Sequence, residues 1–88
     1  SIIKSDVFMY IKKINTKFDI IFADPPYNLE DTKYFTMINE IFKKNCLKSD
    51  GYLIIEHSSK KVFNKIQYFN KSKKYGDSTF SFFTKLNN

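Results

Sequence analysis

The chain has 88 residues, 15 lysines, no arginine and a formal net charge of +6 at pH 7. This length allows at most one small domain, below the usual size of a complete α/β nucleotide-binding unit. One cysteine and one histidine exclude a self-contained zinc cluster and a disulfide framework. No apolar run approaches the roughly 20 residues needed to span a membrane. We therefore expect no metal and no membrane partner, and a cytoplasmic protein, because nothing suggests secretion.

The charge permits an anionic partner such as nucleic acid, although lysine without arginine is a weak sign of phosphate recognition.

The first half of the chain predicts two strands with a helix between them. Residues 1–5 (SIIKS) are typical of a short strand, and Ser5 or Asp6 is a suitable N-cap for a helix that runs to about Ile14. The next strand, residues 18–23 (FDIIFA), is almost continuously apolar. Such a run indicates a strand buried on both faces in a parallel sheet.

A rigid polar turn, Asp24-Pro25-Pro26-Tyr27, follows this strand directly. Both Asp24 and Pro25 precede a proline and are therefore restricted to extended conformations, and the two prolines donate no backbone hydrogen bond. The turn thus holds a carboxylate, a free carbonyl and an aromatic ring at the carboxyl end of a strand, where open α/β sheets bind ligands. These groups suit methyl transfer to an exocyclic base amine, because the oxygens can accept the amine hydrogens and Tyr27 can stack on the base. An ordinary Pro-Pro turn with a solvated Asp24 is the competing interpretation.

The middle of the chain predicts a helix and a second buried strand. After a polar loop at residues 28–31, apolar residues at helical spacing predict an amphipathic helix from about Thr32 to Asn45. Cys46 at its end is expected to be a packing residue. Residues 49–51 (SDG) predict a break before a strand at residues 52–56 (YLIIE).

The last third predicts a short helical segment and a hairpin. Residues 59–66 have the pattern of one or two helical turns, and residues 67–74 and 79–86 flank a turn at Tyr75–Ser78. In the final strand the alternation predicts a buried face made of Phe80, Phe82, Thr84 and Leu86. His57 and Ser58 are not a catalytic pair, because adjacent strand residues face opposite ways. We expect His57 to be structural or to line the cleft.

This order of elements predicts the trailing part of a doubly wound, mainly parallel α/β sheet that ends in an antiparallel β-hairpin. Three segments, FDIIFADPPY, GYLIIEHS and KKYGDSTFSFF, in this order and spacing resemble the RsmD family of ribosomal RNA guanine-N2 methyltransferases. The resemblance covers essentially all 88 residues. It implies a partial Rossmann-like methyltransferase fold, S-adenosylmethionine as cofactor, and methyl transfer to a guanine N2 amine in small-subunit ribosomal RNA, free or in a partly assembled subunit.

The resemblance also implies a set of site residues. Asp24 accepts from the target amine, Pro25 and Pro26 shape the site, and Tyr27 stacks on the base. Asp6 matches an acidic position near the cofactor adenine, and Asp24 also borders the cofactor. Direct transfer of this kind needs no covalent intermediate.

The chain departs from the family pattern because it has no Gly-rich cofactor turn; its only glycines are Gly51 and Gly76. Residues 1–88 are therefore interpreted as the carboxyl-terminal portion of a single methyltransferase domain that lacks the amino-terminal cofactor-binding strands. In the family's sheet two missing strands separate the strand at Ile2 and Ile3 from the strand at residues 20–23, so an isolated fragment is expected to expose strand edges, to self-associate and to be inactive.

Two alternatives remain open. An adenine-N6 DNA methyltransferase uses a similar turn, although the hairpin signature argues against it. A non-catalytic, Lys-rich remnant that binds RNA or a partner chain would account for the charge without chemistry.

Overall fold

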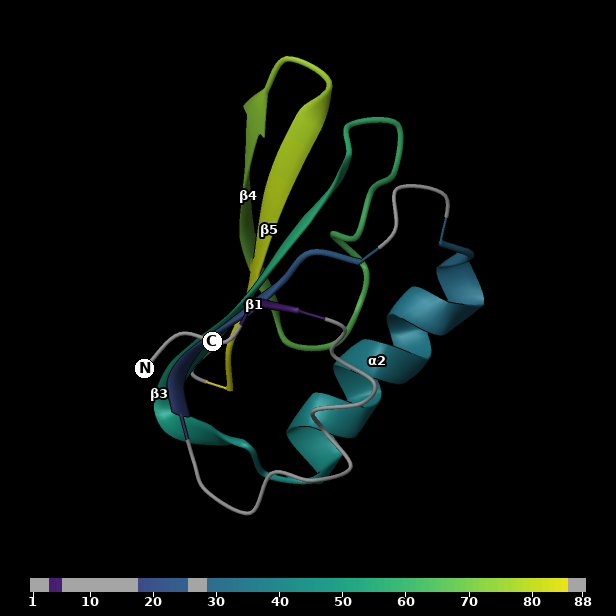
Figure 1. Cartoon of the computed structure of the whole chain (residues 1–88). Helices are drawn as coiled ribbons and strands as arrows, with labels where there is room; N and C mark the ends of the chain where they lie inside the picture. The colour runs from purple at the N-terminus through teal and green to yellow at the C-terminus, as the bar shows by residue number, and fades with distance from the viewer. Residues whose placement is uncertain (1–3, 6–17, 26–28, 86–88) are drawn as a thin grey trace.

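A computed structural model of the chain describes residues 4–5, 18–25 and 29–85, which form one sheet and one helix (Figure 1). The helix predicted for residues 6–14 lies outside the described residues. The elements in chain order are β1 (Lys4–Ser5), β2 (Phe18–Ala23), α2 (Asp31–Lys43), β3 (Leu47–Ser58), β4 (Phe69–Tyr75) and β5 (Ser78–Phe83).

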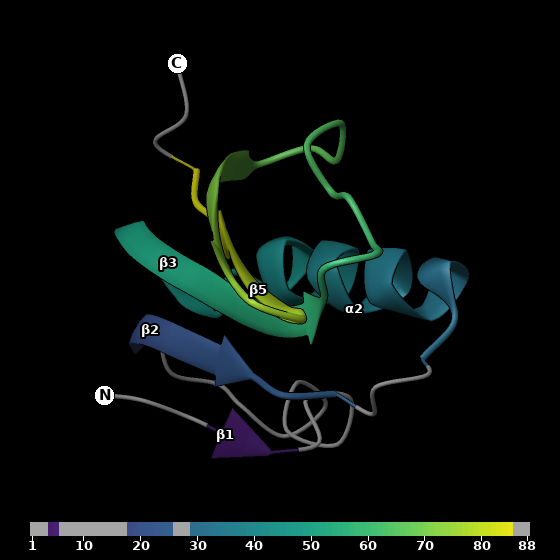
Figure 2. The ribbon, with the colours of Figure 1, turned by 90° about the horizontal axis from the view of Figure 1, so that it is seen from above.

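The sheet combines parallel strands with an antiparallel hairpin. Its order is β1-β2-β3-β5-β4. Strands β1, β2 and β3 run parallel, and β5 is antiparallel to both β3 and β4. The predicted α/β class and terminal hairpin are therefore confirmed. Figure 2 shows α2 lying along one face of the sheet, beside β3 and β5.

The pairing of β1 with β2 differs from the arrangement that the resemblance implies for the complete sheet of the family. Lys4 is opposite Phe22 and Ser5 is opposite Ala23, so the two strands are neighbours in this chain, with no space for other strands between them. The physical reason is the strong requirement of backbone N–H and C=O groups for partners. Among the described strands, β1 meets this requirement by pairing with the end of β2.

Helix α2 forms where the amphipathic pattern predicts it, with different ends. It begins at Asp31, whose carboxylate favourably occupies the first turn, and ends at Lys43 rather than Asn45. Asn45 adopts a left-handed conformation (φ 56°), and the Cys46 and Asn45 amides donate to the carbonyls of Ile41 and Phe42. This is a Schellman C-cap, with asparagine in the position that glycine most often takes.

Strand β3 is longer than predicted, because the Ser49-Asp50-Gly51 signal does not end it. The strand runs from Leu47 to Ser58, and its register with β2 shifts: Phe18 is opposite Leu47, whereas Ile20 is opposite Tyr52. Lys48, Ser49 and Asp50 are accommodated in this irregularity as exposed residues. The turn-forming residues therefore cause a local bulge within a continuous strand.

The connection between β3 and β4 contains turns and no helix, which corrects the prediction for residues 59–66. Single i to i+3 bonds join the Lys61 amide to the Ser58 carbonyl, the Ile66 amide to Phe63 and the Phe69 amide to Ile66. Tyr68 has a positive φ of 74°, which ends the segment before β4. Phe63 is buried and fixes this loop to the core.

The hairpin is confirmed. Within β5 the buried face is the opposite of the predicted one, whereas Thr84, which follows β5, is buried as predicted. Gly76 and Asp77 form a two-residue loop, and Gly76 has a φ of 61°, a conformation that glycine adopts without strain. In β5 the buried residues are Thr79, Ser81 and Phe83, whereas Phe80 and Phe82 are only half-buried. Leu86 lies outside the described residues. The reversal is possible because the inward hydroxyl groups have hydrogen-bond partners, as shown below.

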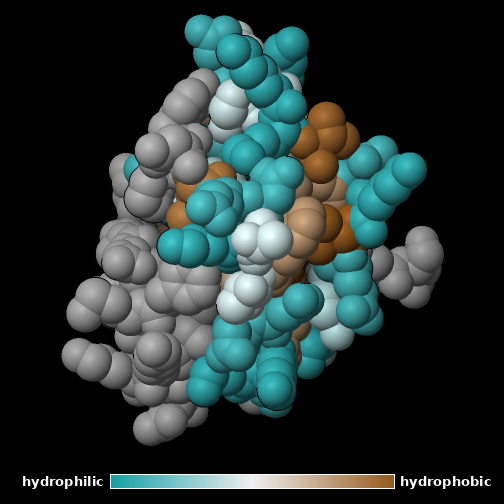
Figure 3. All heavy atoms as spheres, turned by 90° about the vertical axis from the view of Figure 1, so that its right-hand side faces the viewer, coloured by the Kyte–Doolittle hydropathy of each residue, from teal (hydrophilic) through white to brown (hydrophobic). Residues whose placement is uncertain are grey.

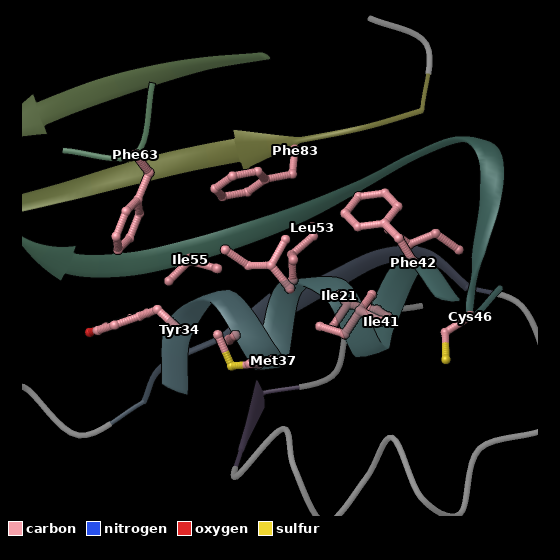
Figure 4. Close-up of a cluster of buried hydrophobic side chains, with 13 residues drawn as sticks. Ile21, Tyr34, Met37, Ile41, Phe42, Cys46, Leu53, Ile55, Phe63 and Phe83 are labelled. Carbon is pink, nitrogen blue, oxygen red and sulfur yellow. The ribbon is translucent and has the colours of Figure 1, made fainter. Parts of the chain in front are cut away.

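The hydrophobic core lies between α2 and the adjacent sheet face (Figure 4). Helix α2 contributes Tyr34, Met37, Ile38, Ile41 and Phe42, and these pack against β2, β3 and β5 residues that include Ile21, Leu53, Ile55 and Phe83. Cys46 is buried beside them, and burial raises the pKa of its thiol, so it is a packing residue as predicted.

Candidate active site at the carboxyl edge of the sheet

The carboxyl ends of β2 and β3 lie at the same edge of the sheet, together with the β4–β5 turn. Ala23 pairs with Ile55, and Ser58 at the end of β3 pairs with Ser78 at the start of β5. Asp24 leaves β2 at this edge, where its side chain is exposed, and the following Pro25 is half-buried. Pro25 has no N–H to donate, so the backbone pairing of β2 ends at Ala23. Asp24 therefore lies just outside the strand.

The structure describes two of the five predicted site residues. Asp24 and Pro25 lie together at the carboxyl edge of the sheet, and their roles in a site stay predictions. Asp6, Pro26 and Tyr27 lie outside the described residues, so their positions in the site stay predictions. Asp24 could accept hydrogen bonds from a substrate amine, because a carboxylate offers acceptor oxygens and this one is open to solvent.

His57 occupies a buried polar position next to this edge. The ring is 2% exposed, its Nδ1 lies 2.8 Å from the Ser58 carbonyl oxygen and its Nε2 lies 2.7 Å from Ser81 Oγ. A carbonyl can only accept, so Nδ1 carries the proton and donates, and Nε2 accepts from the Ser81 hydroxyl. Both ring nitrogens are thereby satisfied in the neutral imidazole.

The environment of His57 disfavours its charged form. Burial lowers the pKa of His57 below its ordinary value, and the nearby Lys61 ammonium lowers it further, whereas the hydrogen bond to the Ser58 carbonyl opposes these effects. The neutral ring packs against Phe63, with ring centroids 4.4 Å apart. His57 is therefore a structural residue at neutral pH.

A pocket of about 170 Å³ opens beside His57, between the loop after β3 and the hairpin. Hydroxyl groups of Ser59, Ser72 and Thr79 and the cationic side chains of Lys61 and Lys74 line it. Ser59 Oγ lies 2.8 Å from Thr79 Oγ1 and donates to the Gly76 carbonyl at 3.1 Å, so it joins the loop to the hairpin turn. Lys61 also contacts Asp31 at the start of α2.

Two features of this polar cluster were not predicted from sequence. Ser81 and Thr79 were assigned to the outer face of β5, because Phe80 and Phe82 made the stronger apolar alternation. The available signal was the position of His57 on a buried strand, since a buried imidazole requires a hydrogen-bond partner. That requirement favours a hydroxyl on the facing strand, but it does not specify which one.

The described residues contain no glycine-rich turn that could cradle a cofactor. Gly51 lies within β3 and Gly76 lies in the hairpin loop, so neither forms a glycine-rich turn at the amino end of a helix. Within the described residues no three His, Cys, Asp or Glu side chains gather as a metal site. In the same residues, no helix has the length and apolar character needed to cross a membrane.

Comparison with solved structures defines the fold class. A conserved hypothetical protein of Streptococcus pyogenes matches 88% of this chain with 26% identity and a TM-score of 0.73. A protein of Haemophilus influenzae described as a "putative methylase" matches 94% of it at 21% identity and a TM-score of 0.67. One of Escherichia coli described as a "putative methyltransferase" matches 90% at 16% identity and a TM-score of 0.63. The chain therefore shares part of the α/β fold of these proteins.

The sequence identifies the family within this class. Residues 1–84 match the family described as conserved hypothetical protein 95, and the chain belongs to that family. No curated protein matches the sequence. The chain spans about half the length of the solved structures it matches, since it covers 49% of the Streptococcus pyogenes protein, 53% of the Haemophilus influenzae protein and 44% of the Escherichia coli protein.

Proposed function

We propose that this chain is the carboxyl-terminal part of an S-adenosylmethionine-dependent methyltransferase that acts on the exocyclic N2 amine of a guanine in small-subunit ribosomal RNA. The single observation that carries the proposal is the exposed Asp24 followed by Pro25 at the carboxyl end of the parallel strand β2. Two structures with the same fold are described as a methylase and a methyltransferase, which supports the reaction class. The resemblance to the RsmD family supports the choice of RNA and guanine.

In this proposal Asp24 makes the target nitrogen a better nucleophile. The lone pair of a guanine amine is delocalised into the ring, so the nitrogen attacks poorly while it stays planar. The Asp24 carboxylate accepts one N–H hydrogen, a carbonyl of the proline pair accepts the other, and Tyr27 stacks on the base. These acceptors lie at a rigid strand end and need little rearrangement in the transition state.

The cofactor would supply the methyl group from its sulfonium centre. Asp6 is proposed to lie near its adenine, and Asp24 to border it. The described residues contain no glycine-rich turn, so we propose that the rest of the cradle belongs to a preceding part of the same domain. It follows that the 88-residue chain alone should not methylate RNA; measurable transfer by the purified chain would contradict this proposal.

The proposal is tested by replacing Asp24 in the complete protein. We expect Asp24→Ala and Asp24→Asn to lower methyl transfer to small-subunit RNA by about 100-fold or more, with RNA affinity nearly unchanged. Asp50→Ala is the matched control, because Asp50 is also exposed but lies in the early, bulged part of β3. Equal turnover of Asp24→Ala and wild type would remove Asp24 from the mechanism.

The acceptor is tested with the same preparations and a labelled methyl donor. Label in small-subunit RNA, recovered as N2-methylguanosine, supports the proposal. Label in DNA as N6-methyladenine would overturn it in favour of the DNA methyltransferase alternative. Salt-sensitive RNA binding without any methyl transfer would favour the non-catalytic alternative.

A further inference from the structure

The net charge of the chain lies entirely in its last third. Residues 57–88 hold seven lysines and one acidic residue, Asp77, which gives +6. Residues 1–56 hold eight lysines and eight acidic residues, which gives zero. The positive charge is thus concentrated in the loop after β3 and in the β4–β5 hairpin. Such segregation of charge is an electrostatic signature of a nucleic-acid partner.

Strand β4 presents this charge at the outer edge of the sheet. Lys71, Lys73 and Lys74 are exposed, as are Lys60 and Lys65 in the preceding loop. In the described part of the chain, ion pairs involve Lys44, Lys48 and Lys61, and none joins a β4 lysine to a carboxylate. The β4 ammonium groups are therefore available to bind phosphates.

The two faces of β4 offer different contacts. Lys74 and Ser72 point toward the pocket beside His57, which the hydroxyls of Ser59 and Thr79 also line. On the opposite face, Lys71 lies over the Phe82 ring, 5.2 Å from its centroid. Figure 3 shows hydrophilic residues at the upper tip of the molecule, where Figure 1 places the hairpin turn, with hydrophobic residues exposed just below them.

Tyr75 adds an aromatic ring to this charged surface. It is 63% exposed at the end of β4, and the Phe80 ring holds it edge-on at 5.8 Å between centroids. An exposed ring that is supported by a second ring is suited to stack on an unpaired base, whereas bases inside a duplex are already stacked. Lysines alone would serve to keep an edge strand from pairing with other sheets, but that role does not require an exposed tyrosine.

The hairpin surface also lies toward the end of the sheet at which Asp24 leaves β2. Glu56, Phe80 and Lys73 form one row across β3, β5 and β4, next to the level at which Asp24 leaves β2. Strands β2 and β4 are three positions apart in the sheet, or about 14 Å at about 4.8 Å per spacing. A single strand bound at the hairpin can therefore reach Asp24 within a few nucleotides.

We infer that the β4–β5 hairpin binds single-stranded RNA that flanks the methylated base: Lys71, Lys73 and Lys74 contact its phosphates, and Tyr75 stacks on one of its bases. This inference rests on the proposed function for its choice of RNA, and it adds a substrate-holding surface that is separate from the methyl-transfer site at Asp24.

The experiment measures how the complete protein binds a labelled single-stranded RNA about 12 nucleotides long. Binding is followed by fluorescence anisotropy over a range of KCl concentrations. The test variant is Lys71→Gln/Lys73→Gln/Lys74→Gln. The matched control is Lys33→Gln/Lys43→Gln/Lys44→Gln, which removes the same charge from exposed positions in α2 and at its C-cap. Both proteins are checked for native circular dichroism before use.

Loss of three phosphate contacts should lower the slope of log K against log salt by about 2 and weaken binding about 100-fold at about 0.1 M salt. The α2 control should retain both slope and affinity within a few-fold. Equal losses in the two triple variants would overturn the inference, because they would show a general charge effect.

Tyr75→Ala tests the base contact separately. We expect it to weaken single-stranded RNA binding about tenfold and to leave binding of an RNA duplex unchanged. Equal weakening for both RNAs, or displacement of the RNA by polyglutamate at equal charge concentration, would overturn the assignment of a single-stranded RNA site.

If the complete protein methylates RNA while the lysine variant binds normally, the hairpin inference fails and the proposed function stands. If the hairpin binds RNA as expected and no methyl transfer occurs, the proposed function fails instead.

Discussion

His57 makes the stability of the fold depend on pH. Because burial lowers the pKa of its ring in the folded state, the unfolded chain binds more protons as the pH falls below the ordinary value of 6.5. The His57 contribution to stability is therefore complete above that pH and is lost as the pH falls toward the folded-state pKa. We expect urea unfolding at about pH 5 to show lower stability than at about pH 7.5, and His57→Gln to reduce this difference. An unchanged difference in the variant would show that other groups cause it.

Ser81 provides the partner that the neutral His57 ring needs. Ser81→Ala would leave the buried Nε2 without a hydrogen bond, and we expect it to lower the free energy of unfolding by about 1–3 kcal/mol. Ser49→Ala is the control, because Ser49 is exposed in the bulge of β3, and we expect a change within about 0.5 kcal/mol. Equal stabilities of the two variants in urea would mean that the imidazole finds another partner, such as water.

Phe63 holds the loop between β3 and β4 against the core. Its ring is 5.1 Å from that of Tyr34 and 6.5 Å from that of Phe83, measured between centroids. We expect Phe63→Ala to destabilise the fold by about 3–5 kcal/mol. The neighbouring Val62 is 73% exposed, so Val62→Ala should change stability by less than about 0.5 kcal/mol. Chemical denaturation of both variants checks this, and a similar small effect at Phe63 would contradict its role as the anchor.

The boundaries of the elements show what local sequence could predict. The apolar spacing in α2 and the Gly76-Asp77 turn were sufficient to predict a helix and a hairpin, because both depend on local preferences. The buried face of β5 was not predictable in this way. Ser81 and Thr79 point inward because His57 and Ser59 on other segments bond to them, and such tertiary partners are absent from the alternation of one strand.

The bulge in β3 has a similar explanation. Ser49-Asp50-Gly51 is a turn signal by composition, but pairing with β2 on both sides of it keeps the strand continuous. At the site, the position of Asp24 at the sheet edge was predictable, because the two prolines determine where the strand ends. The pocket beside His57 was not, since it is formed by the loop after β3 and the hairpin together.

On the scale of the whole molecule, the proposed site at Asp24 and the excess of positive charge lie on different parts of one sheet. Asp24 is at the end of β2, and the lysines that make up the net charge follow β3 and line β4. The opposite end of the sheet order is occupied by β1, which pairs with β2 over two residues only. This short pairing is the feature that the family resemblance did not predict, because the resemblance places other strands there.

Nucleoside analysis of the source cells tests the central proposal most directly. The gene that encodes this chain is inactivated, and ribosomal RNA and DNA are digested and examined by mass spectrometry. We predict loss of N2-methylguanosine from small-subunit RNA, restored by the complete gene and by Asp50→Ala but not by Asp24→Ala. Unchanged N2-methylguanosine, or restoration by Asp24→Ala, would contradict the account.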